Sequence, residues 1–149
     1  MIAFAFAGQP AAYGSGNYRS ARKAAYQQAY QQALLVAHPA AMLQSGDLYG
    51  IVLYFTKRRN DYVDPDADNI SKPVWDSLTG YAYSNDRQIR LRTSGVVNLG
   101  ELSLTELAVE TLPSAILTDL ENFVLADELR HLLYIHVAPL RADQYCFQL

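Results

Sequence analysis

Residues 48–55 read Leu-Tyr-Gly-Ile-Val-Leu-Tyr-Phe, an apolar run rich in β-branched and aromatic side chains. Such a run predicts a buried strand, because these side chains pack well on a pleated surface. A charged loop over 57–64 follows the run, and a short helix is then expected to end near Leu78, with Gly80 just past its end. The run therefore predicts a buried strand joined to a helix through a charged loop.

Apolar spacing on both sides of this run predicts the other elements. They are strands over 3–7, 88–97 and 131–138 and helices over 20–37 and 114–128. Residues 102–109 fit either a strand or a helix. The predicted fold class is α+β: a single domain over 1–149 with a mixed β-sheet, helices packed on it, and the order β-α-β-α-β-(insert)-β.

The composition is that of a globular protein. Half of the 149 residues are apolar and 18% are charged. No apolar run approaches the roughly 20 residues that a membrane span needs, and residues 1–7 are interpreted as a strand rather than a signal peptide. One cysteine, Cys146, allows no internal disulfide. We therefore expect a cytoplasmic protein with no membrane partner.

The net charge of −3 is unevenly distributed along the chain. Residues 1–92 hold ten Lys and Arg against seven acids, whereas residues 93–149 hold two against eight. The excess of acid is expected to lie in an insertion at about 101–130, within a chain whose isoelectric point is near 5.5. The first two thirds of the chain therefore carry the basic residues that a nucleic acid would need.

Residues 57–69 read Lys-Arg-Arg-Asn-Asp-Tyr-Val-Asp-Pro-Asp-Ala-Asp-Asn. Asp64, Asp66 and Asp68 repel one another unless a cation lies among them. Carboxylate oxygens suit Mg²⁺, Mn²⁺ or Ca²⁺ rather than zinc. The first alternative is a solvated acidic loop in which Asp68 or Ser71 caps the following helix. The second alternative, an EF-hand calcium loop, is rejected at three positions. Residue 69 is Asn where that loop needs Gly, residue 72 is Lys where it needs a metal ligand, and residue 75 is Trp where it needs Glu.

The residues after this cluster carry a longer pattern. Residues 66–80 read Asp-Ala-Asp-Asn-Ile-Ser-Lys-Pro-Val-Trp-Asp-Ser-Leu-Thr-Gly, and residues 85–89 read Asn-Asp-Arg-Gln-Ile. This pattern resembles the RusA family of Holliday-junction resolvases (crossover junction endodeoxyribonucleases). That family carries Asp-x-Asp-Asn, a Lys three residues later, often Pro next, then Asp-x-Leu, and after a turn an Asp-x-Gln that opens the next strand. The tract from Lys57 to Ile89 matches in order, and the preceding strand-helix-strand fits more loosely.

The resemblance implies a set of catalytic residues. Asp66, Asp68 and Asp86 are expected to hold Mg²⁺, with Mn²⁺ as an alternative, and Lys72 is expected to meet the scissile phosphate. Hydrolysis of a phosphodiester needs such charge neutralisation and a metal-bound water. The structural alternative for Lys72 is an ion pair with Asp68 or Asp76 at four-residue spacing.

Supporting and DNA-binding residues are expected around this set. Asp76 is expected to orient Lys72, Gln88 to hold Asp86, and Asn69 to cap the helix or to hold a ligand carboxylate. The expected DNA-binding residues are Lys57, Arg58 and Arg59 before the acidic loop and Arg19, Arg22 and Lys23 at the start of the first helix.

The resemblance implies a Mg²⁺-dependent, structure-selective endodeoxyribonuclease for recombination and repair. Such a protein resolves a four-way DNA junction by paired symmetric nicks, and its partners would be branched DNA and a second copy in a homodimer. Two alternatives remain open. One is a non-catalytic RusA-like module that binds branched DNA or a protein partner, and the other is a nuclease that acts on other DNA or on RNA.

Overall fold

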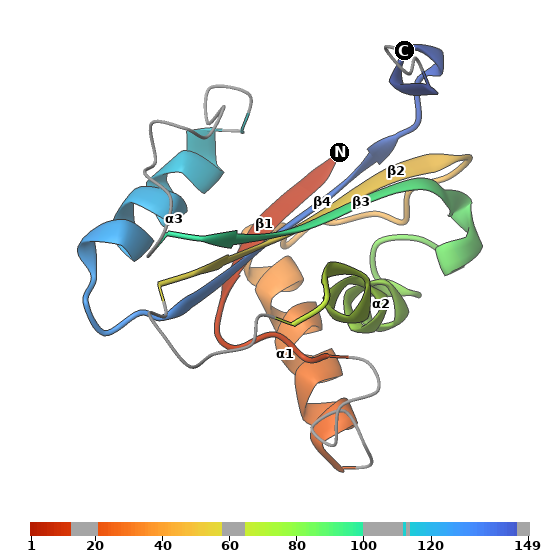
Figure 1. Ribbon diagram of the computed structural model, residues 1–149. Coiled ribbons are helices and arrows are strands. Elements are labelled where there is room, and N and C mark those ends of the chain that lie inside the picture. Colours follow the sequence, from red (N-terminus) through yellow and green to blue (C-terminus); the bar gives the residue numbers. More distant parts are fainter. Residues whose placement is uncertain (13–20, 58–64, 100–111, 113, 146–149) are drawn as a thin grey trace.

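The computed structural model describes residues 1–12, 21–57, 65–99, 112 and 114–145, whose strands form one mixed sheet (Figure 1). The strands are β1 (Ile2–Ala7), β2 (Leu48–Thr56), β3 (Ile89–Asn98) and β4 (His131–Pro139), in the spatial order β1-β4-β2-β3. Strands β2 and β3 are parallel, whereas β4 is antiparallel to both β1 and β2. The predicted α+β fold with a mixed sheet is confirmed.

Helices lie on both faces of this sheet. They are α1 (Ala21–Ala37), α2 (Ala67–Leu78) and α3 (Ser114–Leu125), with short 3-10 helices η2 (Asp86–Gln88) and η5 (Ala142–Tyr145). Helices α1 and α2 cover one face and α3 lies against the other (Figure 1). The helix predicted over 114–128 ends earlier, at Leu125. Residues 102–109, near the start of the predicted acidic insertion, lie outside the described residues, whereas the later part of the insertion contains α3.

Each face of the sheet has its own apolar core. On the α1 and α2 face, Leu34 of α1 and Trp75 of α2 belong to one cluster with Val52 of β2, and all three are at most 1% exposed. On the other face, Phe123 of α3 belongs to a second cluster with Phe55 of β2. Burial of these faces provides the main stabilisation, since each large apolar side chain removed from water contributes about 1.5–3 kcal/mol.

Helix α2 connects the two parallel strands and is strongly amphipathic. Its buried side includes Ile70, Val74 and Leu78, packed on the sheet. The polar residues Asp68 and Lys72, one turn apart, lie among the more exposed positions. As predicted, Gly80 follows the end of the helix, with a φ of +83° that a glycine adopts without strain. The crossover helix therefore carries Asp68 and Lys72 on its exposed side.

Candidate active site

Helix α2 begins at the acidic cluster. Asp66 is the N-cap residue, and its side-chain Oδ1 accepts a hydrogen bond from the Asp68 main-chain N–H at 3.4 Å. The predictions of Asp68 or Ser71 as the cap are therefore wrong, because the chain enters the helix before either residue. Asn69 lies inside the first turn and does not cap the helix, so only its predicted contact with a ligand carboxylate stays open. Asp64 lies outside the described residues.

Lys72 lies one turn further along α2 and forms an ion pair with Asp76, with 2.8 Å between Nζ and Oδ1. This ion pair is the structural alternative expected for Lys72 at four-residue spacing. It is also the contact through which Asp76 is expected to orient Lys72. The hydrogen bond to Asp76 raises the pKa of Lys72, and the negative charge of Asp86 acts in the same direction. Lys72 is therefore a cation at neutral pH, and its side chain is 46% exposed.

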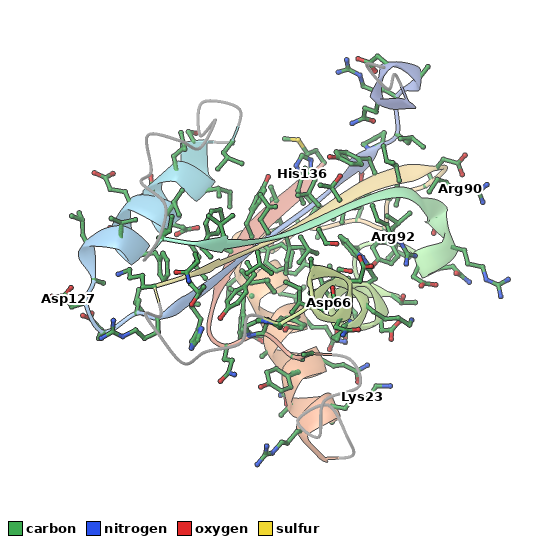
Figure 2. All side chains as sticks on the ribbon, viewed as in Figure 1. Lys23, Asp66, Arg90, Arg92, Asp127 and His136 are labelled. Carbon is green, nitrogen blue, oxygen red and sulfur yellow. The ribbon has the colours of Figure 1, made fainter. Side chains whose placement is uncertain are left out.

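Side chains of β3 contact two carboxylates of the site, those of Asp86 and Asp68. Arg92 donates from Nη2 to the Asp86 main-chain oxygen at 2.8 Å and to Asp86 Oδ2 at 3.4 Å. Ser94 Oγ donates to Asp68 Oδ1 at 3.4 Å. In Figure 2, Arg92 and Asp66 lie on the α2 side of the sheet, whereas Asp127 lies beyond α3. The structure thus places Asp68, Lys72 and Asp86 along one surface between α2 and β3.

Arg92 and Ser94 are site residues that the sequence analysis missed. The signal was present as polar side chains two positions apart in the strand that follows Asp86, namely residues 92 and 94. Alternation alone places these side chains on a common face but leaves open which face that is.

Gln88 fixes the turn that carries Asp86. Its side-chain oxygen accepts hydrogen bonds from the main-chain N–H groups of Ser84 and Asn85, and its amide donates to the main-chain oxygens of Gln44 and Gly46. Within the described part of the chain, Gln88 thus holds the main chain around Asp86 rather than the Asp86 carboxylate. A supporting role of Gln88 in the site stays a prediction.

Tyr83 fixes the same turn from the protein interior. Its hydroxyl donates to the main-chain oxygen of Trp75 at 2.7 Å, so the segment before η2 is tied to α2. Burial raises the pKa of Tyr83, so the hydroxyl stays protonated and remains a donor at neutral pH. These contacts keep η2, and with it Asp86, at a fixed position relative to α2.

The predicted DNA-binding residues are distributed over several places. Lys57 donates from Nζ to the main-chain oxygens of Val124 at 3.2 Å and Ala126 at 2.6 Å, at the end of α3. Arg22 and Lys23 are exposed in the first turn of α1. Arg19, Arg58 and Arg59 lie outside the described residues. A DNA contact stays a prediction for each of these residues, and for Lys57 the structure adds a role in holding α3.

The donor set of the site consists of carboxylates. Among the described residues, no group of three or more His, Cys, Asp or Glu side chains is placed to hold a metal ion. Mg²⁺ commonly uses only one or two protein carboxylates and completes its coordination with waters and substrate phosphate. Asp68 and Asp86, both partly or fully exposed, are of the kind that this coordination requires. The carboxylates of Asp68 and Asp86 therefore fit the predicted Mg²⁺ ion. The carboxylate of Asp66 also caps α2.

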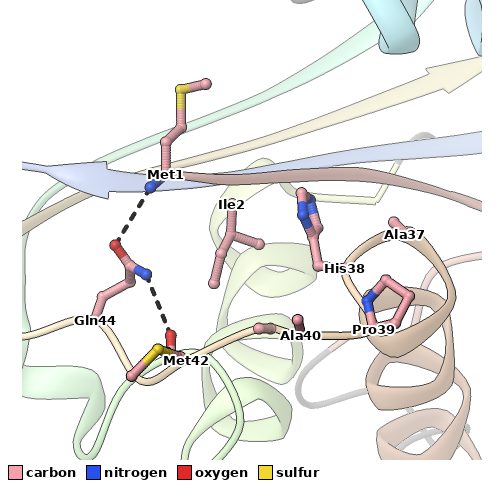
Figure 3. A pocket seen from close by; sticks show the side chains of 9 residues that line it. Met1, Ile2, Ala37, His38, Pro39, Ala40, Met42 and Gln44 are labelled. Carbon is pink, nitrogen blue, oxygen red and sulfur yellow. Dashed lines mark hydrogen bonds between the residues drawn. The ribbon is translucent and has the colours of Figure 1, made fainter.

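A pocket of about 410 Å³ lies elsewhere, between the start of β1 and the chain after α1 (Figure 3). In it the amino group of Met1 donates to Gln44 Oε1 at 3.3 Å. The lining includes no Asp, Glu, Lys or Arg, and its His38 has Nε2 at 2.8 Å from the Ala3 main-chain oxygen. Apart from the Met1 amino group, the lining residues of this pocket carry no cation for a phosphate and no carboxylate for a metal ion.

The fold and the site define an α+β protein with carboxylates and cations gathered on one surface beside a crossover helix. A family model described as "Endodeoxyribonuclease RusA" matches residues 7–101, and the chain belongs to the RusA endodeoxyribonuclease family. A comparison with curated proteins finds no match. The matched range includes Asp66, Asp68, Lys72 and Asp86 and ends where the acidic insertion was predicted to begin. Among the described residues, no helix has both the length and the apolar character that crossing a membrane requires.

Proposed function

We propose that the protein is a divalent-metal-dependent endodeoxyribonuclease that cuts branched DNA, with a four-way junction as its substrate. One observation carries the proposal: Asp68, Lys72 and Asp86 lie along a single surface between α2 and β3, within the part of the chain that matches the family. Carboxylates beside a cation are the groups that hydrolysis of a phosphodiester needs.

Each side chain has a proposed part in the reaction. Asp68 and Asp86 would hold Mg²⁺ or Mn²⁺, with Asp66 beside them at the start of α2. The bound ion would supply an activated water and neutralise negative charge on the phosphate. Lys72 would contact a phosphate oxygen as a point charge, and Asp76 keeps its ammonium in place through the 2.8 Å contact. Ser94 and Arg92 hold Asp68 and Asp86 where they are.

Paired nicks require two sites, so we propose that the protein acts as a homodimer. A two-fold dimer would present two identical sites to opposed strands of a junction. The work of such an enzyme would belong to DNA recombination and repair in the cytoplasm.

The experiment is cleavage of a labelled four-way DNA junction in Mg²⁺ or Mn²⁺ by the wild-type protein and by Asp68→Asn. We expect symmetric nicks from the wild type that are lost in EDTA. In Asp68→Asn we expect a loss of at least about 100-fold, since even residues that only support metal ligands are worth 10–100-fold. Asp127→Asn is the matched control, because it makes the same chemical change at an exposed residue beyond α3, and it should cut at the wild-type rate.

The outcomes separate the proposal from its alternatives. Junction binding without cleavage in either metal would support a non-catalytic binding module. If an unlabelled linear duplex or an RNA reduced cleavage of the labelled junction as much as an unlabelled junction does, the result would support a nuclease of other specificity. Equal loss of activity in Asp68→Asn and Asp127→Asn would contradict the assigned site.

A further inference from the structure

Strand β3 contains a β-bulge next to the candidate site. Leu48 of β2 pairs with Ile89, but the next residue, Tyr49, pairs with Leu91, so Arg90 is an extra residue in β3. From there the pairing is regular, with Gly50 opposite Arg92. Bulges of this kind redirect the side chains that follow them. Ile89 and Arg92 therefore share a face of the sheet although they are an odd number of residues apart.

The face that the bulge selects for Arg92 is the one that α2 covers. Gly50, its partner in the register, lies against α2, since a Cβ there would be 2.8 Å from Trp75 Cη2. Ser94, two residues further on, contacts Asp68 of α2. In Figure 2, Arg92 lies between β3 and the turn that carries Asp86, whereas Arg90 points away at the end of the strand. The bulge thus places Arg92 in the site and leaves Arg90 outside it.

The guanidinium of Arg92 is held but not buried. Both hydrogen bonds that the described residues make with it use Nη2, and the side chain is 38% exposed. A guanidinium has five N–H donors in a planar fork that matches the oxygens of a phosphate. Nε and Nη1 are therefore not engaged by the described residues, while Asp86 keeps the group in a defined orientation.

Arg92 is also the second cation of this surface. The positive charge of Arg92 acts to lower the pKa of Lys72, against the stronger effect of Asp76, so the two cations lie close enough to repel each other. Asp76 and Asp86 each neutralise one of them. Asp86 engages only Nη2 of Arg92, so Nε and Nη1 can donate to a phosphate whether or not Asp86 holds a metal ion.

We propose that Arg92 is a phosphate-binding residue that contacts the DNA backbone beside Lys72, presented there by the bulge at Arg90. The inference rests on the proposed function, because it names a further contact of the same site. The competing interpretation is that Arg92 only holds Asp86 in position and makes no contact with DNA.

The test measures DNA binding rather than cleavage. Fluorescence anisotropy with a labelled four-way junction and a labelled linear duplex, in EDTA so that no DNA is cut, gives the affinity at several salt concentrations. Arg92→Gln should weaken binding to both DNAs by about 10-fold, the value of one charged hydrogen bond. It should also reduce the slope of log K against log salt by about 1. Arg92→Lys keeps the charge and should keep the slope.

Arg90→Gln is the matched control, because it removes the same charge two residues away on the side chain that points away from the site. An effect of Arg92→Gln no larger than that of Arg90→Gln would overturn the inference, since it would reflect only the loss of one surface charge. An unchanged salt slope together with slower cleavage would show that Arg92 only positions Asp86, and would also overturn it. A wild-type protein that binds neither DNA would contradict the proposed function itself.

Discussion

At the scale of single residues, Gly50 sets how closely α2 approaches the sheet. A Cβ at this position would lie 2.8 Å from Trp75 Cη2 and 2.9 Å from Ile89 Cγ2, closer than such atoms normally approach. Trp75 is 1% exposed and lies in a packed core, so it cannot move aside freely. Because Asp68 and Lys72 belong to the same helix as Trp75, this close contact also sets the position of the site.

We therefore expect Gly50→Ala to lower the free energy of unfolding by about 1–3 kcal/mol, the usual cost of an added methyl group in a packed core. Urea denaturation followed by circular dichroism measures the change. Gly95→Ala on β3 is the matched control, since its Cβ would meet only Leu53 Cδ2, at 3.2 Å. Both changes alter the unfolded chain in the same way, so an equal loss in the two variants would contradict the steric explanation.

At the scale of elements, Lys57 joins the end of β2 to the end of α3. Its ammonium donates to two main-chain oxygens at the C-terminal end of the helix, those of Val124 and Ala126. It also lies 4.7 Å from the centre of the Phe123 ring. A cation at this end of a helix is favoured by the helix dipole and satisfies carbonyl groups that have no partner within the helix. Lys57 therefore contributes to holding α3 on the sheet.

Lys57→Met should lower the free energy of unfolding by about 1.5–3 kcal/mol, the range for hydrogen bonds to a charged group. It should also speed amide exchange over 114–125, as measured by hydrogen–deuterium exchange. Lys72→Met is a matched change in which only a partly exposed ion pair is lost, and it should cost less than about 1 kcal/mol. If the two variants proved equally stable, the contacts of Lys57 would have no structural value.

At the scale of the whole molecule, the family match and the folded unit have different limits. The match covers 7–101, but β4 lies at His131–Pro139 and occupies the place between β1 and β2 in the sheet. All six residues of β1 pair with β4, and β1 pairs with no other described strand. The part of the chain that defines the family therefore depends on a later strand to complete its sheet.

A truncated chain of residues 1–101 should consequently fail to fold, and it should show no cooperative unfolding transition in urea. Without β4, β1 has no partner strand, and both apolar cores lose the buried side chains that β4 contributes. The control is a chain of residues 1–141, which keeps β4 and lacks η5 and the C-terminal residues beyond it. We expect this control to unfold cooperatively, and a cooperative transition in residues 1–101 would refute the dependence on β4.

Much of the fold followed from the sequence because its signals are local. The strand predicted over 48–55 and the helix predicted over 20–37 agree with β2 and α1 to within a residue. The cap of α2 was predicted wrongly because Asp66, Asp68 and Ser71 all have side chains that can cap, and they lie within five residues of one another. Local pattern identifies the turn at which a helix begins but does not choose among such neighbours.

The missed parts of the site depend on contacts between distant segments. The role of Arg92 depends on a bulge, and strict alternation from Ile89 would have placed its side chain on the opposite face of the sheet. Lys57 contacts the main-chain oxygens of Val124 and Ala126, which lie 67 and 69 positions further along the chain. By contrast, Asp68, Lys72 and Asp86 could be predicted as site residues from the sequence, because their spacing follows a family pattern.

The placement of α3 on the opposite face of the sheet from α2 has a practical consequence. The exposed Glu121 of α3 is separated from the candidate site by the full thickness of the sheet and its two cores (Figure 1). In a chain that also carries Cys146→Ser, a cysteine introduced there could hold a fluorescent dye or a tether to a glass surface while the face with Asp68 and Asp86 stays accessible. Single molecules could then be immobilised by α3 and watched as they engage DNA.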